Sequence, residues 1–182
     1  MPGKEYIMPI GRINVIALVL IIPLAVVLGL PFALIHGFDT VSFKNLNLSS
    51  IVGGGITVVA IFLLGAVVHE FLHGITWSLF ASKGWKSISF GVKWEYLTPY
   101  CHCSEPLKKS HFIYGAIMPC LILGLFPVIF SYFNGNFKLW FFGFFFTVAA
   151  SGDLIAIWML RKVSKDKMIQ DHPDEMGFYV EE

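Results

Sequence analysis

The 182-residue chain carries too little charge for an ordinary soluble domain. Hydrophobic residues make up 56% of it and charged residues only 14%, whereas soluble domains average about 25% charged residues. This composition excludes a disordered chain, and a formal net charge of +1 excludes a basic surface for nucleic acid. Three cysteines, an odd number, predict reduced thiols rather than a disulfide framework.

Four apolar runs are each long enough to cross a bilayer, which takes roughly 20 residues of helix. Backbone polar groups in lipid must be satisfied within their own segment, and helices do this. We therefore predict an all-α integral membrane fold, in which residues 1–182 form a single domain built on a bundle of four transmembrane helices. The predicted helices cover about residues 13–35, 51–79, 112–133 and 139–160.

The connection between the second and third predicted helices has the periodicity of a strand. Over residues 86–96, apolar side chains alternate with polar residues or glycine, as in a half-buried strand. We predict a short membrane-associated strand or hairpin here. Its edge is a candidate site for pairing with an extended peptide, with Val92 and Trp94 as candidate substrate contacts. The alternative is an amphipathic strand that rests on the bilayer.

Lysine and arginine are distributed unevenly around the four apolar runs. Of the 13 such residues, 11 lie in the N-terminal segment, the second connection and the tail at residues 161–182, while Lys44 and Lys138 lie in the other two connections. Cytoplasmic loops carry the excess of basic residues. We therefore predict that both termini and the second connection are cytoplasmic, and that residues 161–182 form a polar cytoplasmic tail.

Four ionisable residues lie within the apolar runs, where each costs roughly 2.5–3.5 kcal/mol on insertion scales. His69, Glu70 and His73 form the H-E-x-x-H pattern of zinc peptidases. Positions four apart on a helix face the same side one turn apart, so the two imidazoles are aimed at one metal. Glu70 is then placed to reach a metal-bound water and is the candidate general base.

Catalytic zinc usually has three protein ligands, and Asp153 is the predicted third. His73 and Asp153 lie ten and eight residues before the next cytoplasmic basic residue, which places both roughly 12–15 Å deep at about 1.5 Å per residue. His102 and His172 are the alternatives for the third ligand. His102 is also a candidate for stabilising the oxyanion of the reaction.

Several segments resemble a bacterial family of zincin membrane peptidases that carry a domain of unknown function. More distantly, the order of motif helix, strand, proline-bearing helix and aspartate-bearing helix is similar to site-2 proteases. The resemblance implies Zn²⁺ held by His69, His73 and Asp153, Glu70 as the base, a zincin-like domain, and a bacterial inner or plasma membrane. The segments that carry it are residues 69–74, 100–106, 151–154, 171–173 and 177–179.

The function that these features favour is that of an integral-membrane zinc metalloendopeptidase. It would hydrolyse peptide bonds of membrane-associated or transmembrane substrates by means of a metal-activated water. Its expected partners are a membrane protein or peptide substrate and the lipid bilayer, with no nucleic acid. The alternatives are a non-catalytic metal or haem membrane protein, and a small transporter or pseudoprotease scaffold whose buried ionisable groups form an ion path.

Overall fold

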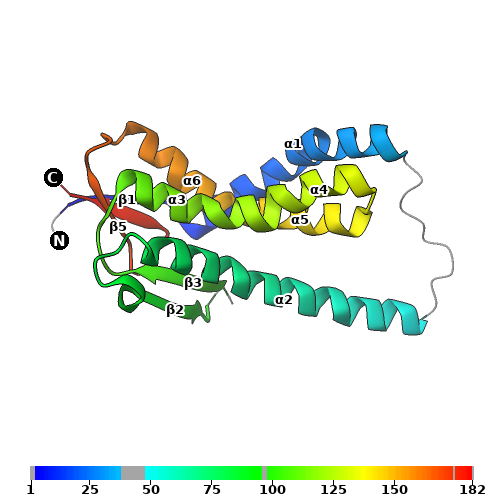
Figure 1. Cartoon of the computed structure of the whole chain (residues 1–182), viewed down its shortest axis with the longest axis horizontal. Helices are drawn as coiled ribbons and strands as arrows, with labels where there is room; N and C mark the ends of the chain where they lie inside the picture. Colours follow the sequence, from blue (N-terminus) through cyan, green and yellow to red (C-terminus); the bar gives the residue numbers. More distant parts are fainter. Residues whose placement is uncertain (1–2, 38–47, 96–97, 174, 182) are drawn as a thin grey trace.

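Long helices fill most of the molecule, and short strands gather at one end of it, beside both chain termini (Figure 1). The computed structural model describes the backbone of residues 3–37, 48–95, 98–173 and 175–181, and the side chains of all of these except 48–52. Lys44, which entered the prediction of orientation, lies outside the described residues. We refer below to the end that carries the strands and both termini as the strand end.

The first two predicted helices are present and slightly longer than expected. Helix α1 spans Ile10–His36 and α2 spans Leu48–Ser78. Both are long and apolar enough to cross a membrane. In Figure 1, α2 runs along one side of the molecule, apart from the other helices over much of its length.

The third predicted helix consists of three helical segments in line. Helix α3 (Lys109–Pro119) continues through the π-helical segment η3 (Cys120–Leu125) into α4 (Phe126–Asn134), and together they form a third helix of membrane-spanning length. Proline lacks a backbone N–H and disrupts the hydrogen bonding of an α-helix, and the π-helical segment begins directly after Pro119. Gly135, with φ 68°, ends α4 in the left-handed conformation that favours glycine.

The fourth apolar run forms a bent pair of helices, where the sequence predicts one helix over residues 139–160. Helix α5 (Phe137–Ala149) and α6 (Ser151–Met159) meet at Ala150, and the pair is bent by 42°. A short 3₁₀ turn, η4 (Leu160–Lys162), follows α6. The described residues thus contain three full-length helices and one bent pair, and the prediction of a four-helix bundle is confirmed only in part.

The predicted hairpin between α2 and α3 is present. After a 3₁₀ turn, η2 (Gly84–Ser87), strand β2 (Ile88–Lys93) pairs antiparallel with β3 (Thr98–Cys103). Strand β3 packs against α2. Residues 96 and 97, at the predicted end of the strand pattern, lie outside the described residues.

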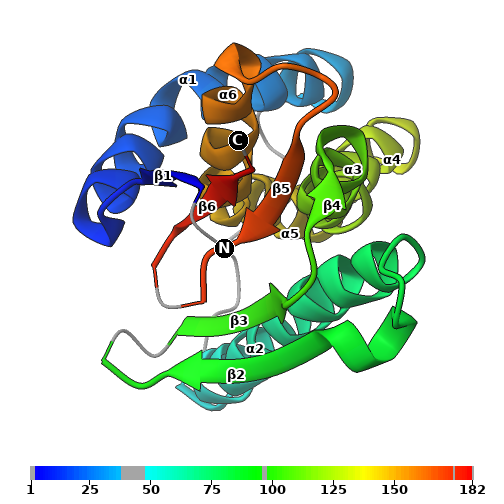
Figure 2. The ribbon, with the colours of Figure 1, turned by 90° about the vertical axis from the view of Figure 1, so that its left-hand side faces the viewer.

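A second sheet, which the sequence analysis did not predict, lies at the strand end (Figure 2). Its order is β1-β6-β5-β4, and all of its pairs are antiparallel. The fold is therefore mostly helical but not all-α, and the predicted tail at residues 161–182 supplies two of the strands. The four strands are β1 (Lys4–Ile7), β4 (Leu107–Lys108), β5 (Met168–Asp171) and β6 (Gly177–Val180).

Two buried clusters hold these elements together. At the strand end, inward-facing residues of the sheet, including Ile169 and Phe178, pack with Trp77 of α2 and Phe112 of α3. The Trp77 indole N–H donates to the Phe112 carbonyl at 3.1 Å. Away from this end, a second cluster joins α1 to α4 and α5. Its buried residues are Phe32, Val128 and Trp140.

Candidate metal centre

The two histidines of the motif lie on the part of α2 that packs against α3 and β3. Both are buried, and their rings are 5.0 Å apart between centroids, edge to face. The Gly65 position, one turn before His69, is filled by the Phe146 ring, which a Cβ there would overlap. The absence of a side chain at Gly65 therefore lets α5 approach α2 directly beside the motif.

Asp153 comes from the opposite part of the bundle and faces both histidines. It lies in the first turn of α6, directly after the bend at Ala150. Its Oδ2 is 3.2 Å from His69 Nε2 and its Oδ1 is 3.3 Å from His73 Nε2. One donor atom from each of the three residues lies within 4.8 Å of the others, a group that could hold a metal ion.

A backbone contact orients His73 for metal binding. His73 Nδ1 lies 2.8 Å from the Gly115 carbonyl oxygen on α3, and because a carbonyl can only accept, Nδ1 carries the proton. The lone pair of Nε2 then points toward Asp153, the arrangement that metal-binding histidines adopt when their second nitrogen is hydrogen-bonded. Two imidazole nitrogens and a carboxylate oxygen are a ligand set that catalytic zinc uses. The residues therefore fit zinc.

Glu70 lies beside this group and lines an apolar groove. Its carboxylate interacts with the backbone N–H of Cys101 on β3. The groove has a volume of about 430 Å³ and runs between α2, α5 and the start of β3. His69 and Glu70 lie at one end of its α2 wall. The other lining residues are Val59, Phe62, Leu63, Ala66, Thr98, Pro99, Phe145, Phe146 and Ala149.

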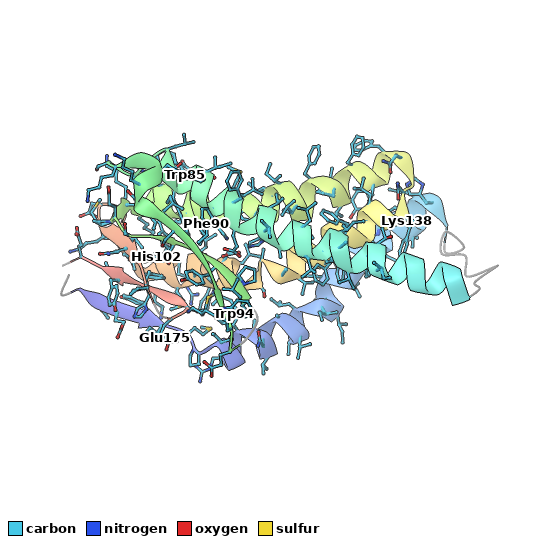
Figure 3. All side chains as sticks on the ribbon, turned by 90° about the horizontal axis from the view of Figure 1, so that it is seen from below. Trp85, Phe90, Trp94, His102, Lys138 and Glu175 are labelled. Atoms are coloured by element: carbon cyan, nitrogen blue, oxygen red, sulfur yellow. The ribbon has the colours of Figure 1, made fainter. Side chains whose placement is uncertain are left out.

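Val92 and Trp94, the predicted substrate contacts, line a different cavity. This second cavity, of about 570 Å³, lies between the end of the β2–β3 hairpin, the start of α1 and the turn after β5. Trp94 is highly exposed, and Figure 3 shows it on the side of the molecule that carries the hairpin. Glu70 and His69 are not among the residues described as lining this cavity.

His102 and His172, the alternative ligands, each lie in a separate polar contact. His102 Nδ1 is 3.1 Å from Asp171 Oδ2, and Figure 3 shows His102 close to the strands of the terminal sheet. Burial raises the pKa of Asp171, and the hydrogen bond from His102 opposes this shift. His172 Nε2 lies 2.9 Å from Glu5 Oε1 and 2.8 Å from the Tyr179 hydroxyl. Among the described residues, neither belongs to the group around Asp153.

Comparison with known proteins identifies the family. A sequence model of the family described as "Putative zincin peptidase" matches residues 62–168. The chain belongs to this family. The match contains the whole H-E-x-x-H motif and Asp153, whereas β1, α1 and β6 lie outside it. No curated protein and no solved structure matches the chain.

Three contacts around the centre were not found from the sequence. Two of them are backbone contacts: the Gly115 carbonyl orients His73, and the Cys101 N–H contacts Glu70. Such contacts cannot be inferred from residue type, because every residue except proline has the same backbone groups. Asp171 is recognisable in sequence only as part of a polar turn. Its partner, His102, lies 69 positions away, a pairing that only the folded chain brings about.

Proposed function

We propose that the protein is an integral-membrane zinc metallopeptidase that hydrolyses peptide bonds of membrane-associated or transmembrane substrates. The observation that carries the proposal is the single carboxylate of Asp153, which faces the Nε2 atoms of His69 and His73 at 3.2 and 3.3 Å. Glu70 lies beside this group at the end of an apolar groove. Membership of a zincin family supports the same chemistry.

We propose that the chain crosses the membrane four times. Strands β1 and β6 pair with each other, although α1 and α6 lie between them in the chain. Two paired strands lie on the same side of a membrane, so the number of crossings between them is even. Within the part of the chain that the structure describes, three helices have full spanning length, and an even number requires the bent α5–α6 pair to be the fourth crossing.

The same pairing divides the crossings into two hairpins. Strand β4, which follows α2, pairs with β5, which follows α6. Strand β4 therefore lies on the same side of the membrane as β5. The chain crosses and returns once through α1 and α2, and crosses and returns a second time through the remaining helices. Most basic residues lie at the strand end, whereas Lys138 lies at the opposite end (Figure 3). The positive-inside rule then supports a cytoplasmic strand end, with both termini in the cytoplasm.

Each residue of the centre has its own role in the proposed hydrolysis. A zinc ion held by His69, His73 and Asp153 would polarise the substrate carbonyl and lower the pKa of a water. Glu70 would take the proton of the attacking water and pass it to the leaving nitrogen. The Gly115 carbonyl holds His73 in the tautomer that leaves Nε2 free to bind the metal.

The apolar groove supports a substrate with a hydrophobic segment. Its wall contains the aromatic rings of Phe62, Phe145 and Phe146 and leads along α2 to Glu70. Strand β3, rather than β2, is the strand that meets Glu70, so β3 is the more suitable edge for holding an extended peptide next to the base. Val92 and Trp94 then contact parts of the substrate farther from the cleaved bond.

The geometry gives less support to the other functions considered. Both His69 and His73 turn toward one carboxylate, so the two cannot bind opposite faces of one haem. An ion path across the membrane would need ionisable groups at several depths. The His69, His73 and Asp153 group instead lies at a single level within the described residues.

Replacement of Glu70 by glutamine tests the proposal. Glu70→Gln keeps the ligand set and removes the base, so we expect zinc content equal to wild type and a loss of cleavage of roughly 10²–10⁴-fold. The measurement is zinc stoichiometry of the purified protein, beside cleavage of single-span reporter proteins in proteoliposomes. Glu181→Gln, at the far end of the tail, is the matched control. Undiminished cleavage by Glu70→Gln would falsify the assignment.

A further inference from the structure

The C-terminal strands and the turn between them contact elements that carry the proposed active site. The side chain of Met176, in the turn between β5 and β6, packs against Gly152, since a Cβ on Gly152 would lie 3.0 Å from Met176 Cε. Gly152 precedes Asp153. On the inner face of the same strands, Ile169 and Phe178 pack in the cluster that buries Cys101 and Cys103 of β3.

A polar contact links the end of β5 to β3. Asp171 Oδ2 lies 3.1 Å from His102 Nδ1, and both side chains are largely buried. The Asp171 carboxylate also interacts with the backbone N–H of Cys103. We call this pair of contacts the latch. A buried hydrogen bond to a charged group is among the stronger single contacts in a protein.

The latch occupies the edge of β3 that a peptide would need. Strand β3 pairs with β2 along one edge, in a two-stranded sheet. Backbone groups of alternate residues in an antiparallel strand point to the same edge, so Pro99, Cys101 and Cys103 face away from β2. Proline has no N–H, the Cys101 N–H meets Glu70, and the Cys103 N–H meets Asp171. Both N–H groups on this edge of β3 therefore already face a carboxylate of the protein.

The base and the latch are neighbours along this edge. Burial raises the pKa of the Cys101 thiol, and the negative charges of Glu70 and Asp171 raise it further. The contacts of Glu70 and Asp171 with the β3 backbone lie two residues apart, at Cys101 and Cys103. A peptide that pairs with the strand must displace these carboxylates, so that its own carbonyl oxygens accept from the N–H groups of β3.

We propose that the latch is an autoinhibitory contact, by which the β5–β6 pair blocks the substrate edge of β3 until a peptide displaces Asp171. The inference rests on the proposed peptidase function and adds a regulation of the same site. Asp171 lies beyond residues 62–168, the part of the chain that matches the family.

Cys103 gives a readout of latch opening that does not depend on catalysis. Its side chain is 1% exposed, and burial raises its pKa to about 11, so alkylation of the closed form is slow because the thiolate is the reactive species. We expect Asp171→Ala and His102→Ala to increase the rate of maleimide labelling at Cys103 by about 10-fold or more. Cys120, buried in η3, serves as the internal reference and keeps its rate.

The same variants are then assayed for cleavage of the single-span reporters. We expect turnover to rise several-fold in Asp171→Ala and His102→Ala, with unchanged zinc content. Asp171→Asn, which keeps one acceptor oxygen, should give intermediate labelling and turnover. Asp166→Ala is the matched control, since Asp166 is exposed and bonds to Ser164 within the tail.

The outcomes separate the latch from the peptidase. Unchanged Cys103 labelling in both variants overturns the latch, whatever the enzyme does. Faster labelling with unchanged or reduced turnover shows that the contact is structural and not inhibitory. If the proposed peptidase function is wrong, the wild-type protein will bind no zinc or cleave no reporter. The rate of Cys103 labelling then still decides whether the tail opens.

Discussion

The two halves of α2 have the same apolar character but entirely different surroundings. In the half away from the strand end, Ile56 is 67% exposed and Leu63 65%. In the half at the strand end, His73 is 4% exposed and Trp77 5%. The contact of α2 with α5 includes Phe62, whose ring lies 4.1 Å from that of Phe145 between centroids.

The difference shows how one helix can have an exposed apolar half, suited to lipid, and a packed half that carries the candidate metal site. A helix in hydrocarbon satisfies its own backbone and needs no protein partner, so the exposed half gains nothing from polar residues. The packed half holds His69, Glu70 and His73, which are expensive in lipid and therefore lie against α3, β3 and α6. The motif histidines lie on the face of α2 that packs against the rest of the protein, while Phe71 on the same half remains 47% exposed.

Removal of the third ligand is the strongest test of this comparison. Asp153→Ala leaves His69 and His73 without the carboxylate that both face, and we expect zinc affinity to fall by more than the roughly 10–100-fold that loss of an outer partner costs. Zinc titration of the purified protein measures this. Asp166→Ala should bind zinc as wild type does. Stoichiometric zinc in Asp153→Ala would show that the packed half recruits its metal without α6.

A pair of glycine substitutions compares the two halves through packing alone. A Cβ at Gly115 would overlap the Trp77 indole, whereas a Cβ at Gly54 meets nothing within 4 Å. We expect Gly115→Ala to lower the free energy of unfolding by about 1–3 kcal/mol, and Gly54→Ala to leave it unchanged or raise it by up to about 1 kcal/mol. Thermal unfolding in detergent measures both, and equal shifts would contradict the comparison.

The indole of Trp77 allows a smaller and more local test. Its N–H donates to the Phe112 carbonyl inside the buried cluster, so Trp77→Phe removes one buried hydrogen bond, while this carbonyl keeps its helical partner within α3. We expect a loss of about 1 kcal/mol. Trp94→Phe, at a highly exposed position, should change stability by less than about 0.5 kcal/mol. A larger loss of stability in Trp94→Phe than in Trp77→Phe would contradict the comparison.

The smallest expected effect concerns the turn just beyond the packed half. Glu105 accepts hydrogen bonds from the Ser87 hydroxyl and from the backbone N–H groups of Ser82 and Lys83, and these bonds lower its pKa. A lowered pKa in the folded state means that the contribution is present above the ordinary glutamate value of about 4.3 and is lost as the pH falls through the folded value.

We therefore expect the amides of Ser82 and Lys83 to lose hydrogen-exchange protection at acidic pH, relative to their intrinsic rates. In Glu105→Gln the protection should be weaker at neutral pH and should no longer depend on this titration. A wild-type pH profile in the variant would assign the protection to another group.

The sequence was sufficient for most of the helices and for the meeting of the two motif histidines on α2. Runs of apolar residues define spans because lipid imposes one solution on them, and the i, i+4 spacing of His69 and His73 brings the two rings together on any helix. The predicted roles of Glu70 and Asp153 remain predictions, although the structure places both residues beside the histidines.

The rest depended on pairings between distant parts of the chain. Strands of four residues, such as β5 and β6, are too short to show a periodicity, and their partners lie far away in sequence. The bend at Ala150 falls directly before Ser151 and Gly152, residues of the kind at which helices kink, but these residues alone do not set the angle. Backbone contacts such as that between His73 and Gly115 cannot be inferred from residue type.

The pairing of β1 with β6 also sets the order in which the protein can be completed. Lys4 pairs with Val180, so β1 leaves the ribosome early and waits until nearly the whole chain described here has been synthesised and its helices inserted. At about 5–20 residues per second, the helices enter the bilayer seconds before the sheet can close. The helices that carry His69, His73 and Asp153 therefore exist for a short time without their sheet in every newly made molecule.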